Sequence, residues 1–486
     1  MSPYIILLTL ALYLLLLFAL SYFSSRKADN AGFFIGNRRT SWYMATLAMI
    51  GAAMSGVTFI SVPGSVATDG FSYMQMVVGF TIGQMIVAFV LIPLFYRLGI
   101  VSLYEYLNSR FGVMTHRAGA WCFLVAKVVG ASLKLYVVCL VMQLLVFDHI
   151  NLHFIWNVSL TMLVVYLYTY RGGVRSLIIT DTLQSLCLVA SVAIVIWFIC
   201  KQMGLTFEGS YELISTSQYS QIWHFDDPSS KYYFWKMVAG GALCLVAMTG
   251  LDQDMMQRNM SCRTVRDSQI NIVLTALCQI VVIAMFLALG ALLYEYIEFR
   301  GLTMPQRGDD AYALVAVNGG LPLVAGIVFV VGLISSTYSA AGSALTSLTT
   351  SFTIDILDAQ HKLCDKALKR LRGVIHLSMA VAMALVIILF EYFASQSAIN
   401  LIFKLAGYTY GPILGMFVYG MISKRKIKEK LLPIVILTSP ALSYLLQWCM
   451  AAKYDYHIGF ELLGYNALFC IFGLILISHN RNDKVS

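Results

Sequence analysis

Residues 51–64 read GAAMSGVTFISVPG and lie within an apolar segment at 41–68. An apolar segment of this length crosses a hydrocarbon core of about 30 Å as a helix. The glycines at 51 and 56 weaken that helix, and Pro63 removes a backbone donor from it. The pattern therefore predicts a helix that is interrupted at membrane depth, which is tolerated only where the freed backbone is buried in protein or lines a cavity.

A second interrupted segment is predicted at 232–251, where Gly240-Gly241 lies in the middle and Gly250 near the end. The two segments are the second and the seventh apolar spans of the chain. Because they are five spans apart, which is an odd number, they enter the membrane from opposite sides. Two five-helix halves with inverted topology place both breaks near the midplane, where transporters bind substrates and coupling ions. The alternative is that the glycines only allow neighbouring helices to pack closely.

The composition is that of an all-α polytopic membrane protein. Of the 486 residues, 59% are hydrophobic and 12% are charged, whereas an ordinary soluble domain has about 25% charged residues. Segments that are apolar on every side exclude a membrane β-barrel, whose strands alternate in polarity. About thirteen transmembrane helices are predicted, at approximately 3–23, 41–68, 72–98, 117–147, 152–170, 176–200, 232–251, 269–297, 321–350, 373–393, 398–422, 431–451 and 460–478.

The positions of the 33 Lys and Arg residues predict the orientation of the chain. With the N-terminus outside, most of them, including Arg258, fall in loops assigned to the cytoplasm. The opposite side holds only Lys201, Lys231, Lys236, Arg300, Arg307 and Lys453. Because cytoplasmic loops carry an excess of Lys and Arg, we expect a plasma (inner) membrane protein with its C-terminus in the cytoplasm. The net charge of +9 is then an orientation signal and not a nucleic-acid-binding surface.

A series of short motifs runs along nearly the whole chain. The series consists of Gly32-Phe33-Phe34-Ile35-Gly36-Asn37-Arg38-Arg39, Met54-Ser55-Gly56 with Pro63-Gly64, Tyr104-Glu105-Tyr106-Leu107 with Arg110-Phe111-Gly112, Gly172-Gly173 through Thr180-Asp181 to Gln184, Asp252-Gln253 with Gln257-Arg258, Phe352-Thr353-Ile354-Asp355-Ile356, and Gly411-Pro412-Ile413-Leu414-Gly415. Each motif is weak alone, but their order and spacing are specific. On them the chain resembles the sodium:solute symporter family.

The resemblance implies the leucine-transporter fold, a five-plus-five inverted-repeat core with one helix before it and two after it. This layout agrees with the thirteen spans counted from hydropathy. Residues 1–486 then form a single transporter domain. Its parts are a first helix at 3–23, repeat one at 41–200, repeat two at 232–422 and accessory helices at 431–478.

A run of small hydroxyl residues at 335–343 is suited to a sodium site, because hydroxyls and free backbone carbonyls are hard oxygen donors. Residues 335, 339 and 343 share one helix face. The alternative is a packing face whose hydroxyls bond to carbonyls of their own helix. The resemblance implies a sodium site formed by the hydroxyl of Ser339 and the carbonyls of Ser336, Gly51 and Met54.

The chain departs from the family pattern at Ala340, where relatives usually have a second hydroxyl. The sodium site is then one ligand short, is completed by water, or shifts by four residues to use Ser335 and Ser336. In the family, the aspartate that matches Asp181 lies on the sodium path and in some members forms a second site. Ser343 fits that second site and Gly342 does not. Alternatively, Asp181 caps its helix or pairs with Arg175.

Lys127 and Lys134 are seven residues apart and lie on one face of the fourth predicted helix. Charges inside membranes are functional candidates because they are unfavourable there unless they are paired. Some relatives that carry carboxylated sugars use a basic residue in this helix, so a substrate carboxylate contacting Lys134 is one hypothesis. The alternatives are a structural pair with Asp181 or with an acidic residue elsewhere, or a lysine that reaches the membrane surface. We expect Lys404 to be a rim residue.

The resemblance also implies part of the substrate pocket. Where sugar-carrying relatives place amide and tyrosine groups, this chain has Thr58, Leu245 and Met248, which argues against a plain hexose. The remaining polar candidates are Ser55, Gln75, Gln84 and Tyr408. Polar residues of this kind also serve to join helices.

We therefore expect a sodium-coupled secondary active symporter that imports a small organic solute, with a carboxylate or a sialic-acid-like anion as the leading class. The predicted partners are the solute, Na+ and the lipid bilayer, without nucleic acid, a further cofactor or a required oligomer. The alternatives are a proton-coupled or uncoupled carrier on the same fold and a solute sensor. The scattered His residues give no support to an enzyme.

Overall fold

The computed structural model describes residues 2–25, 33–34, 38–100, 102–170, 173–393, 398–454, 456 and 458–479. Several residues of the predicted motifs, namely Gly32, Ile35, Gly36, Asn37 and Gly172, lie outside this part of the chain, as does the side chain of Arg175.

Eight helices of the described residues are long and apolar enough to cross a membrane, and up to ten are if each bent pair counts as one span. The long helices are α1 (Pro3–Ser25), α6 (Tyr73–Ile86) with α7 (Ile92–Leu98), α9 (Val113–Met142), α11 (Gly173–Gln202), α15 (Val265–Phe299), α17 (Leu323–Ser351), α19 (Asp365–Phe393) and α21 (Leu432–Tyr454). The bent pairs are α3 (Trp42–Ala53) with α4 (Gly56–Gly64), and α13 (Phe234–Leu245) with α14 (Gln253–Met260).

The remaining predicted spans are also helical. They are α10 (Phe154–Thr169), α20 (Ala398–Ile422) and α22 (Leu462–Leu476). Since α10 and α22 have only 16 and 15 residues, the number of thirteen spans stays a prediction. The short elements are α5 (Val66–Asp69), α8 (Glu105–Arg110), α12 (Phe207–Thr216), α16 (Ala311–Ala313), α18 (Ala359–Lys362) and the antiparallel strands β1 (Lys426–Ile427) and β2 (Ser478–His479).

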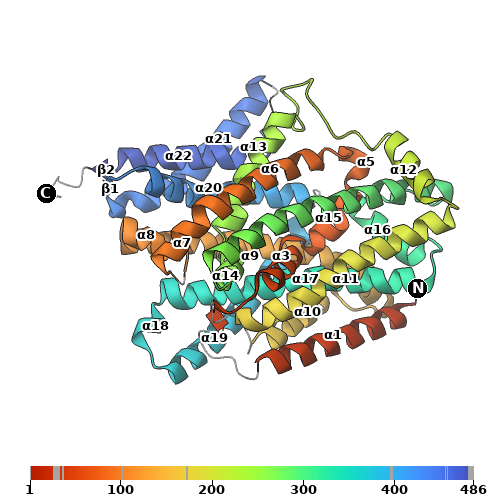
Figure 1. Cartoon of the computed structure of the whole chain (residues 1–486), viewed down its shortest axis with the longest axis horizontal. Coiled ribbons are helices and arrows are strands. Elements are labelled where there is room, and N and C mark those ends of the chain that lie inside the picture. Colours follow the sequence, from red (N-terminus) through yellow and green to blue (C-terminus); the bar gives the residue numbers. More distant parts are fainter. Residues whose placement is uncertain are drawn as a thin grey trace.

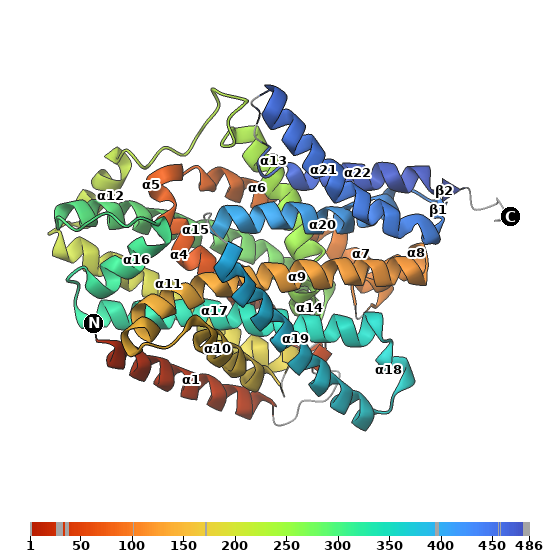
Figure 2. The ribbon, with the colours of Figure 1, turned by 180° about the vertical axis from the view of Figure 1, so that it is seen from behind.

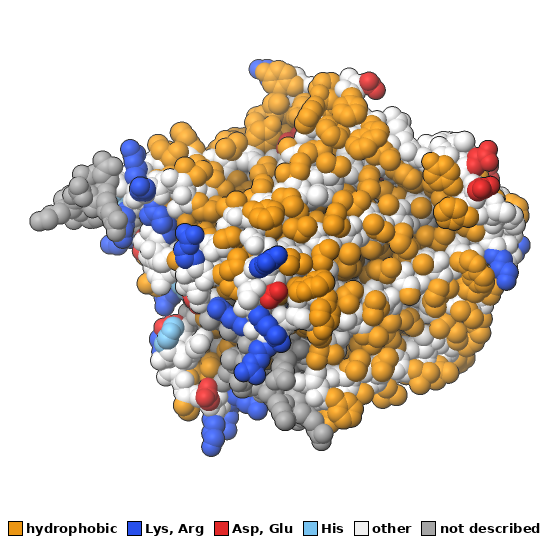
Figure 3. All heavy atoms as spheres, in the orientation of Figure 1, with side chains coloured by type: hydrophobic (Ala, Val, Ile, Leu, Met, Phe, Trp, Pro, Cys, Tyr) orange, Lys and Arg blue, Asp and Glu red, His pale blue; other side chains and the backbone are white. Residues whose placement is uncertain are grey.

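Most of the long helices run side by side along the long axis of the molecule, and the chain ends at the opposite end from where it begins (Figures 1 and 2). Helix α17 packs against α11, α9, α3 and α4, and helix α6 packs against α13 and α15. On the face seen in Figure 3, hydrophobic side chains cover the middle of the molecule, and Lys and Arg side chains gather toward the end where the C-terminus lies. This distribution is that of a multi-pass membrane protein.

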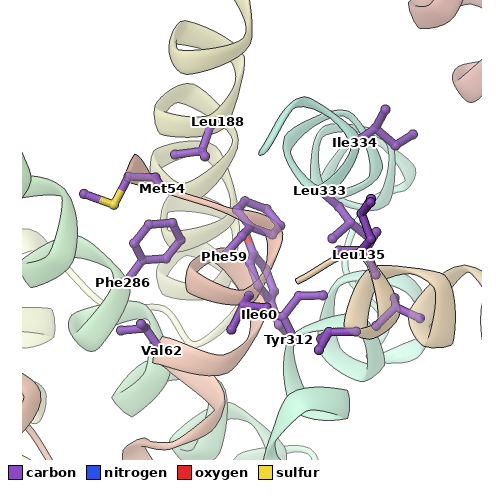
Figure 4. Packing of buried hydrophobic residues seen from close by; sticks show 14 of the residues in the cluster. Met54, Phe59, Ile60, Val62, Leu135, Leu188, Phe286, Tyr312, Leu333 and Ile334 are labelled. Atoms are coloured by element: carbon purple, nitrogen blue, oxygen red, sulfur yellow. The ribbon is translucent and has the colours of Figure 1, made fainter. Parts of the chain in front are cut away.

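The break predicted in the segment 41–68 is confirmed, because α3 and α4 meet at a bend of 57°. Pro63 does not make this break, since it lies inside α4 one residue before the helix ends. Aromatic rings pack around α4 instead: the ring of Phe59 lies 5.9 Å from that of Phe286 and 5.0 Å from that of Tyr312 (Figure 4). The broken helix is therefore held in a well-packed core.

The second predicted break is present, but it does not lie at the glycine pair of its span. The bend of 65° lies between α13 and α14, at Leu251 and Asp252. Gly240 and Gly241 lie within α13, and a Cβ atom at Gly241 would lie 3.1 Å from Cγ of Met76 and 3.3 Å from Cα of Gly79 on α6. Gly240 and Gly241 therefore allow neighbouring segments to pack closely, which is the alternative given above.

Candidate functional site

The first break exposes backbone oxygens at the centre of the helix bundle. Met54 has φ −92° and ψ 84°, and Ser55 is extended. A helix end leaves its last carbonyl groups without partners along the helix. Among the described residues, no backbone N–H donates to the carbonyl oxygen of Gly51 or of Met54. The break therefore offers oxygen donors that an unbroken helix would use for its own hydrogen bonds.

Helix α17 lies directly against this break. A Cβ atom at Gly51 would lie 3.3 Å from Oγ of Ser339, and one at Gly56 would lie 3.7 Å from Oγ of Ser336. Both serines are buried, with 0% and 1% exposure. The structure thus brings Gly51, Ser336 and Ser339 together, with Met54 at the break between the two halves of the helix.

The hydroxyls on the shared face of α17 all bond to other helices. The phenol of Tyr13 and Oγ of Ser335 are 2.6 Å apart, Oγ of Ser339 donates to Oδ1 of Asp181 at 2.8 Å, and Arg258 donates to Oγ of Ser343. The prediction that these three serines share a face agrees with this pattern. Because the hydroxyl of Ser335 bonds to α1, a shifted sodium site that uses Ser335 receives no support from the geometry.

The other hydroxyls in this run behave differently. Oγ of Ser336 and Oγ1 of Thr337 both donate to the carbonyl of Leu333, at 2.8 and 2.6 Å. For these two residues, the alternative of hydroxyls that bond within their own helix holds. The hydroxyl groups of these two residues are therefore used inside α17.

Asp181 is buried on α11 with 0% exposure and does not cap that helix, which begins at Gly173. Its Oδ2 accepts from Nη2 and Nε of Arg258 at 2.9 and 3.3 Å, while its Oδ1 accepts from Ser339. The pairing with Arg175 falls on a side chain outside the described residues. Arg258, assigned above to a cytoplasmic loop, is instead a buried residue of α14 with 2% exposure.

Side chains hold the second break. The hydroxyl of Tyr104 donates to the carbonyl of Leu251 at 3.1 Å, and that of Tyr410 donates to Oδ2 of Asp252 at 2.6 Å. Asp252 also caps α14 by accepting from the backbone N–H of Asp254 at 2.9 Å. The carbonyl of Leu251 and the N–H of Asp254 at this break are therefore bonded by side chains.

Two ion pairs add to these bonds. Nζ of Lys127 lies 3.1 Å from Oδ1 of Asp252 and 2.8 Å from Oδ2 of Asp254. Oδ1 of Asp254 in turn lies 2.5 Å from Nη1 of Arg258. For Lys127, the structural alternative is thus the correct one, with Asp252 and Asp254 as its partners. A continuous chain of ionic contacts runs from Lys127 through Asp254 and Arg258 to Asp181.

Lys134 differs from Lys127, although both lie on one face of α9. In the described part of the chain, no hydrogen bond or ion pair is found for its ammonium group. Lys134 lines an open cavity beside the first break, with about 770 Å³ of empty space including its mouth. A partly buried ammonium group that faces a cavity is available to bind an anion.

This cavity contains several of the predicted substrate residues. Ser55, Thr58, Lys134, Leu245 and Met248 all line it, together with Tyr73, Phe80, Thr249, Gln279 and Ile283. Apolar side chains thus form most of the wall and leave a few polar groups to orient a ligand, as is usual for small-molecule sites.

Three other predicted substrate residues lie outside the cavity lining and join parts of the fold. Gln75 donates to the carbonyl of Tyr232 at 2.9 Å, and Gln84 donates to Oε1 of Gln279, also at 2.9 Å. Tyr408 donates to Oε1 of Gln447 at 2.7 Å. For these three, the alternative of polar groups that join segments of the fold describes the structure.

A second cavity adjoins the first and shares Ala52, Lys134, Met248 and Met255 with it. Its wall also includes Lys127, Asp252, Asp254 and Tyr410, and Ala340 and Ala344 of α17. Ala340 thus lines the same cavity as Ala52 of the broken helix.

The partners of Asp252, Asp254 and Tyr410 were not predicted from the sequence. The run Asp252-Gln253-Asp254 with Arg258 followed an apolar span directly, and Asp254 and Arg258 have the i, i+4 spacing of a helical ion pair. That spacing, together with an unexplained lysine in a neighbouring span, was the signal available in the sequence.

Comparisons with known proteins assign the chain to a family. A model of the sodium:solute symporter family matches residues 33–430. The chain is 27% identical over 401 residues to the sodium-dependent multivitamin transporter of Oryctolagus cuniculus, which covers 80% of this chain and 61% of that protein. It is 26% identical to the sodium/iodide cotransporter of Homo sapiens (82% and 61% covered) and 27% identical to the sodium-coupled monocarboxylate transporter 1 of Mus musculus (80% and 64% covered). The matched chain therefore spans less than two thirds of these relatives.

Solved structures show the same fold. A Na+-coupled sialic acid symporter in a substrate-bound, outward-open state superposes with a TM-score of 0.80 at 19% identity, covering 97% of both chains. A nucleobase-cation-symport-1 family transporter in a closed conformation superposes with a TM-score of 0.61 at 13% identity, covering 93% of this chain and 96% of the other. The predicted leucine-transporter fold is confirmed.

Proposed function

The chain belongs to the sodium:solute symporter family, and from that premise we propose that it imports a small organic solute together with sodium by alternating access. The observation that carries this proposal is the position of Ser339 against the first break, beside a cavity lined by that break. Rocking of the helices around such a central site would open it to the two sides of the membrane in turn.

The carbonyls of Gly51, Met54 and Ser336 and the hydroxyl of Ser339 would hold the sodium ion. These groups fit a hard cation, because the break leaves the carbonyls of Gly51 and Met54 without backbone donors and oxygen is the donor that such cations prefer. Sodium bound between α3 and α17 would hold the broken helix in the conformation that forms the adjacent cavity. Sodium binding would thereby favour solute binding.

We propose an anionic solute, with a carboxylate as the leading class. Lys134 supports this class because its ammonium group faces the cavity without a partner among the described residues. Two relatives are named for anions, iodide and monocarboxylates. Ser55, Thr58 and Thr249 supply hydroxyls near Lys134, and Leu245, Met248 and Phe80 would contact the organic part of the solute.

We also propose the plasma (inner) membrane as the location, with the N-terminus outside and the C-terminus in the cytoplasm. The gathering of Lys and Arg side chains at the C-terminal end supports this orientation (Figure 3). In the same layout, α1 precedes repeat one at 41–200 and repeat two at 232–422, and α21 and α22 follow them. Nothing in this mechanism requires an oligomer.

The test is uptake into proteoliposomes that contain the purified full-length chain. Radiolabelled propionate, pyruvate, a sialic acid, glucose, an amino acid and a vitamin are supplied with sodium, lithium or potassium outside. We expect uptake of a carboxylate that requires external sodium and is absent from protein-free liposomes. Uptake that is indifferent to sodium would contradict the proposed coupling, and sodium-dependent uptake of neutral solutes alone would contradict the anionic class.

A proton-coupled or uncoupled carrier is the second candidate, and one observation favours it. Ala340 lies near the first break without the hydroxyl that relatives have there, which removes one ligand from the proposed sodium site. Uptake that follows an imposed pH gradient in sodium-free buffer would select this candidate.

A further inference from the structure

Two glutamine side chains form a polar pair in an apolar part of the first cavity's wall. Gln279 of α15 lines that cavity, and its Oε1 accepts from Nε2 of Gln84 on α6 at 2.9 Å. Phe80 lies one helical turn from Gln84 and Ile283 one turn from Gln279, and both line the cavity. A polar group in such a wall is unfavourable unless it has a hydrogen-bond partner.

The amide nitrogen of Gln279 is open to the cavity. In the part of the chain that the structure describes, Gln84 is the hydrogen-bond partner found for Gln279, and it bonds to the oxygen. The nitrogen Nε2 is not among the enclosed side-chain atoms that lack a partner, so a solute in the cavity can reach it. Because an amide nitrogen carries two N–H donors, Gln279 presents donors to that solute.

The orientation of the two amides follows from the surroundings of Gln84. This residue is buried, and its Oε1 has no partner among the described residues. If both amides were reversed, the nitrogen of Gln84 would take the enclosed position and its N–H groups would lack partners. A buried N–H without a partner is rarer in proteins than a carbonyl oxygen without one. The nitrogen of Gln279 is therefore the atom that faces the cavity.

Lys134 and Gln279 present different chemistry to the same cavity. Among the described residues that line it, Lys134 has the one charged side chain. A second carboxylate on the solute would therefore find no cation, whereas the N–H groups of Gln279 suit a neutral carbonyl or hydroxyl oxygen. Helices α9 and α15, which carry the two residues, both pack against α4 of the broken helix. One solute can thus be held by its carboxylate and by a second, neutral oxygen.

We propose that Gln279 is a specificity-determining residue whose amide nitrogen donates to a neutral oxygen of the solute, so that the cavity selects oxo- or hydroxy-monocarboxylates over plain ones. A plain carboxylate would displace water from the N–H groups of Gln279 without replacing its hydrogen bonds, which is unfavourable. Gln84 is a positioning residue, because it holds the oxygen of Gln279 and leaves the nitrogen to the solute. This inference rests on the proposed function, since it presumes a carboxylate at Lys134.

The test measures dissociation constants by isothermal titration calorimetry, on the purified full-length chain in detergent with sodium. The ligands are matched pairs that differ in one oxo group: pyruvate with propionate, levulinate with pentanoate, and a longer acid with an oxo group near its far end with the plain acid of equal length. We expect the oxo acid of at least one pair to bind at least about fivefold more tightly than its plain partner.

The outcomes separate the inference from the proposed function. Equal or weaker binding of the oxo acid in every pair would overturn the inference and leave a carboxylate symporter standing. Absence of binding by all of these carboxylates would overturn the proposed anionic class and the inference with it.

Variants test whether Gln279 causes the preference. In Gln279→Leu, we expect the oxo acid to lose its advantage over the plain acid. The matched control is Ile283→Leu, on the same face of α15 and in the same cavity wall but without a hydrogen-bonding group, for which we expect the wild-type ratio of the two dissociation constants. A wild-type ratio in folded Gln279→Leu would overturn the assignment.

The same ratio tests Gln84. Gln84→Leu removes the group that orients Gln279 but leaves the donor in the cavity wall, and we expect a ratio between those of the wild type and Gln279→Leu. A merely structural role would weaken the binding of both acids alike, so an unchanged ratio in folded Gln84→Leu would overturn its role as a positioning residue.

Discussion

The two broken helices have similar bends, 57° and 65°, but their surroundings are opposite in kind. The first break lies between Gly51 and Gly56, where the sequence has no charged side chain, and no backbone N–H of the described residues donates to the carbonyls of Gly51 and Met54. At the second break, Tyr104 and Lys127 bond to Leu251 and Asp252. Under the proposed function, the first break would offer oxygens to a sodium ion, whereas Lys127 and the hydroxyls of Tyr104 and Tyr410 bond to groups of the second break.

This difference shows how one backbone device can serve two purposes. A break in a membrane helix frees polar groups that need partners, because the hydrocarbon supplies none. Where a diffusible ion provides the partner, the local structure depends on that ion. Where Lys127 and Arg258 provide it, the structure is permanent. We therefore expect the first break to respond to sodium and the second to remain fixed.

The largest expected effect is at the second break. Lys127→Met leaves Asp252 and Asp254 with one cation fewer in a buried site, and we expect the free energy of unfolding to fall by about 3 kcal/mol or more. Thermal or denaturant unfolding in detergent measures it. The matched control is Lys134→Met, on the same face of α9 but without a bonded partner, which should change stability by less than about 1 kcal/mol. Equal losses in both variants would remove the distinction between the two lysines.

The next effect concerns the solute. Lys134→Met removes the proposed contact to the carboxylate, and a lost charge-assisted hydrogen bond of about 1.5–3 kcal/mol corresponds to roughly 10–100-fold weaker binding. The KM for carboxylate uptake measures this change, with Lys134→Arg as the variant that keeps the charge. Full affinity in folded Lys134→Met would rule out the carboxylate contact.

Several features of the two broken helices could be predicted from residue types. Hydropathy located the long helices, because a segment of about twenty apolar residues is long enough to cross the membrane as a helix, but it did not predict short helices such as α12 and α14. The first break followed from glycines around Met54-Ser55. For the second, Gly240-Gly241 was misleading, since a glycine pair weakens a helix and permits close packing equally well, and only the neighbouring helix α6 decides between them.

The site was harder to predict than the fold. The hydroxyl face of α17 was readable from the i, i+4, i+8 spacing of its serines, but no local pattern shows which partner each hydroxyl finds. The pairing of Lys127 with Asp252 and Asp254 joins residues 125 and 127 positions apart in the sequence. Contacts of this range depend on how the two repeats pack, so the sequence did not show that Arg258 lies in the buried interior.

The smallest expected effect concerns sodium binding at the first break. Ala340→Ser adds the hydroxyl that the family resemblance implies for this position, in a cavity that Ala52 of the broken helix also lines. One additional neutral oxygen ligand that contributes about 0.5–1.5 kcal/mol should lower the dissociation constant for sodium roughly 2–10-fold. A ²²Na⁺ isotherm measures the change, with Ala344→Ser, one helical turn away on α17, as control. Equal shifts in both variants would contradict a role specific to position 340.

The central claim is that the first break and Ser339 bind sodium, and the most direct measurement is the affinity of the purified chain for ²²Na⁺ in Ser339→Ala beside Ser336→Ala. Ser339 is proposed to bind through its hydroxyl, whereas Ser336 is proposed to bind through its carbonyl and uses its hydroxyl within α17. We expect roughly tenfold weaker sodium binding in Ser339→Ala, equivalent to about 1.4 kcal/mol, and wild-type affinity in Ser336→Ala. Wild-type affinity in Ser339→Ala, with the loss in Ser336→Ala instead, would contradict it.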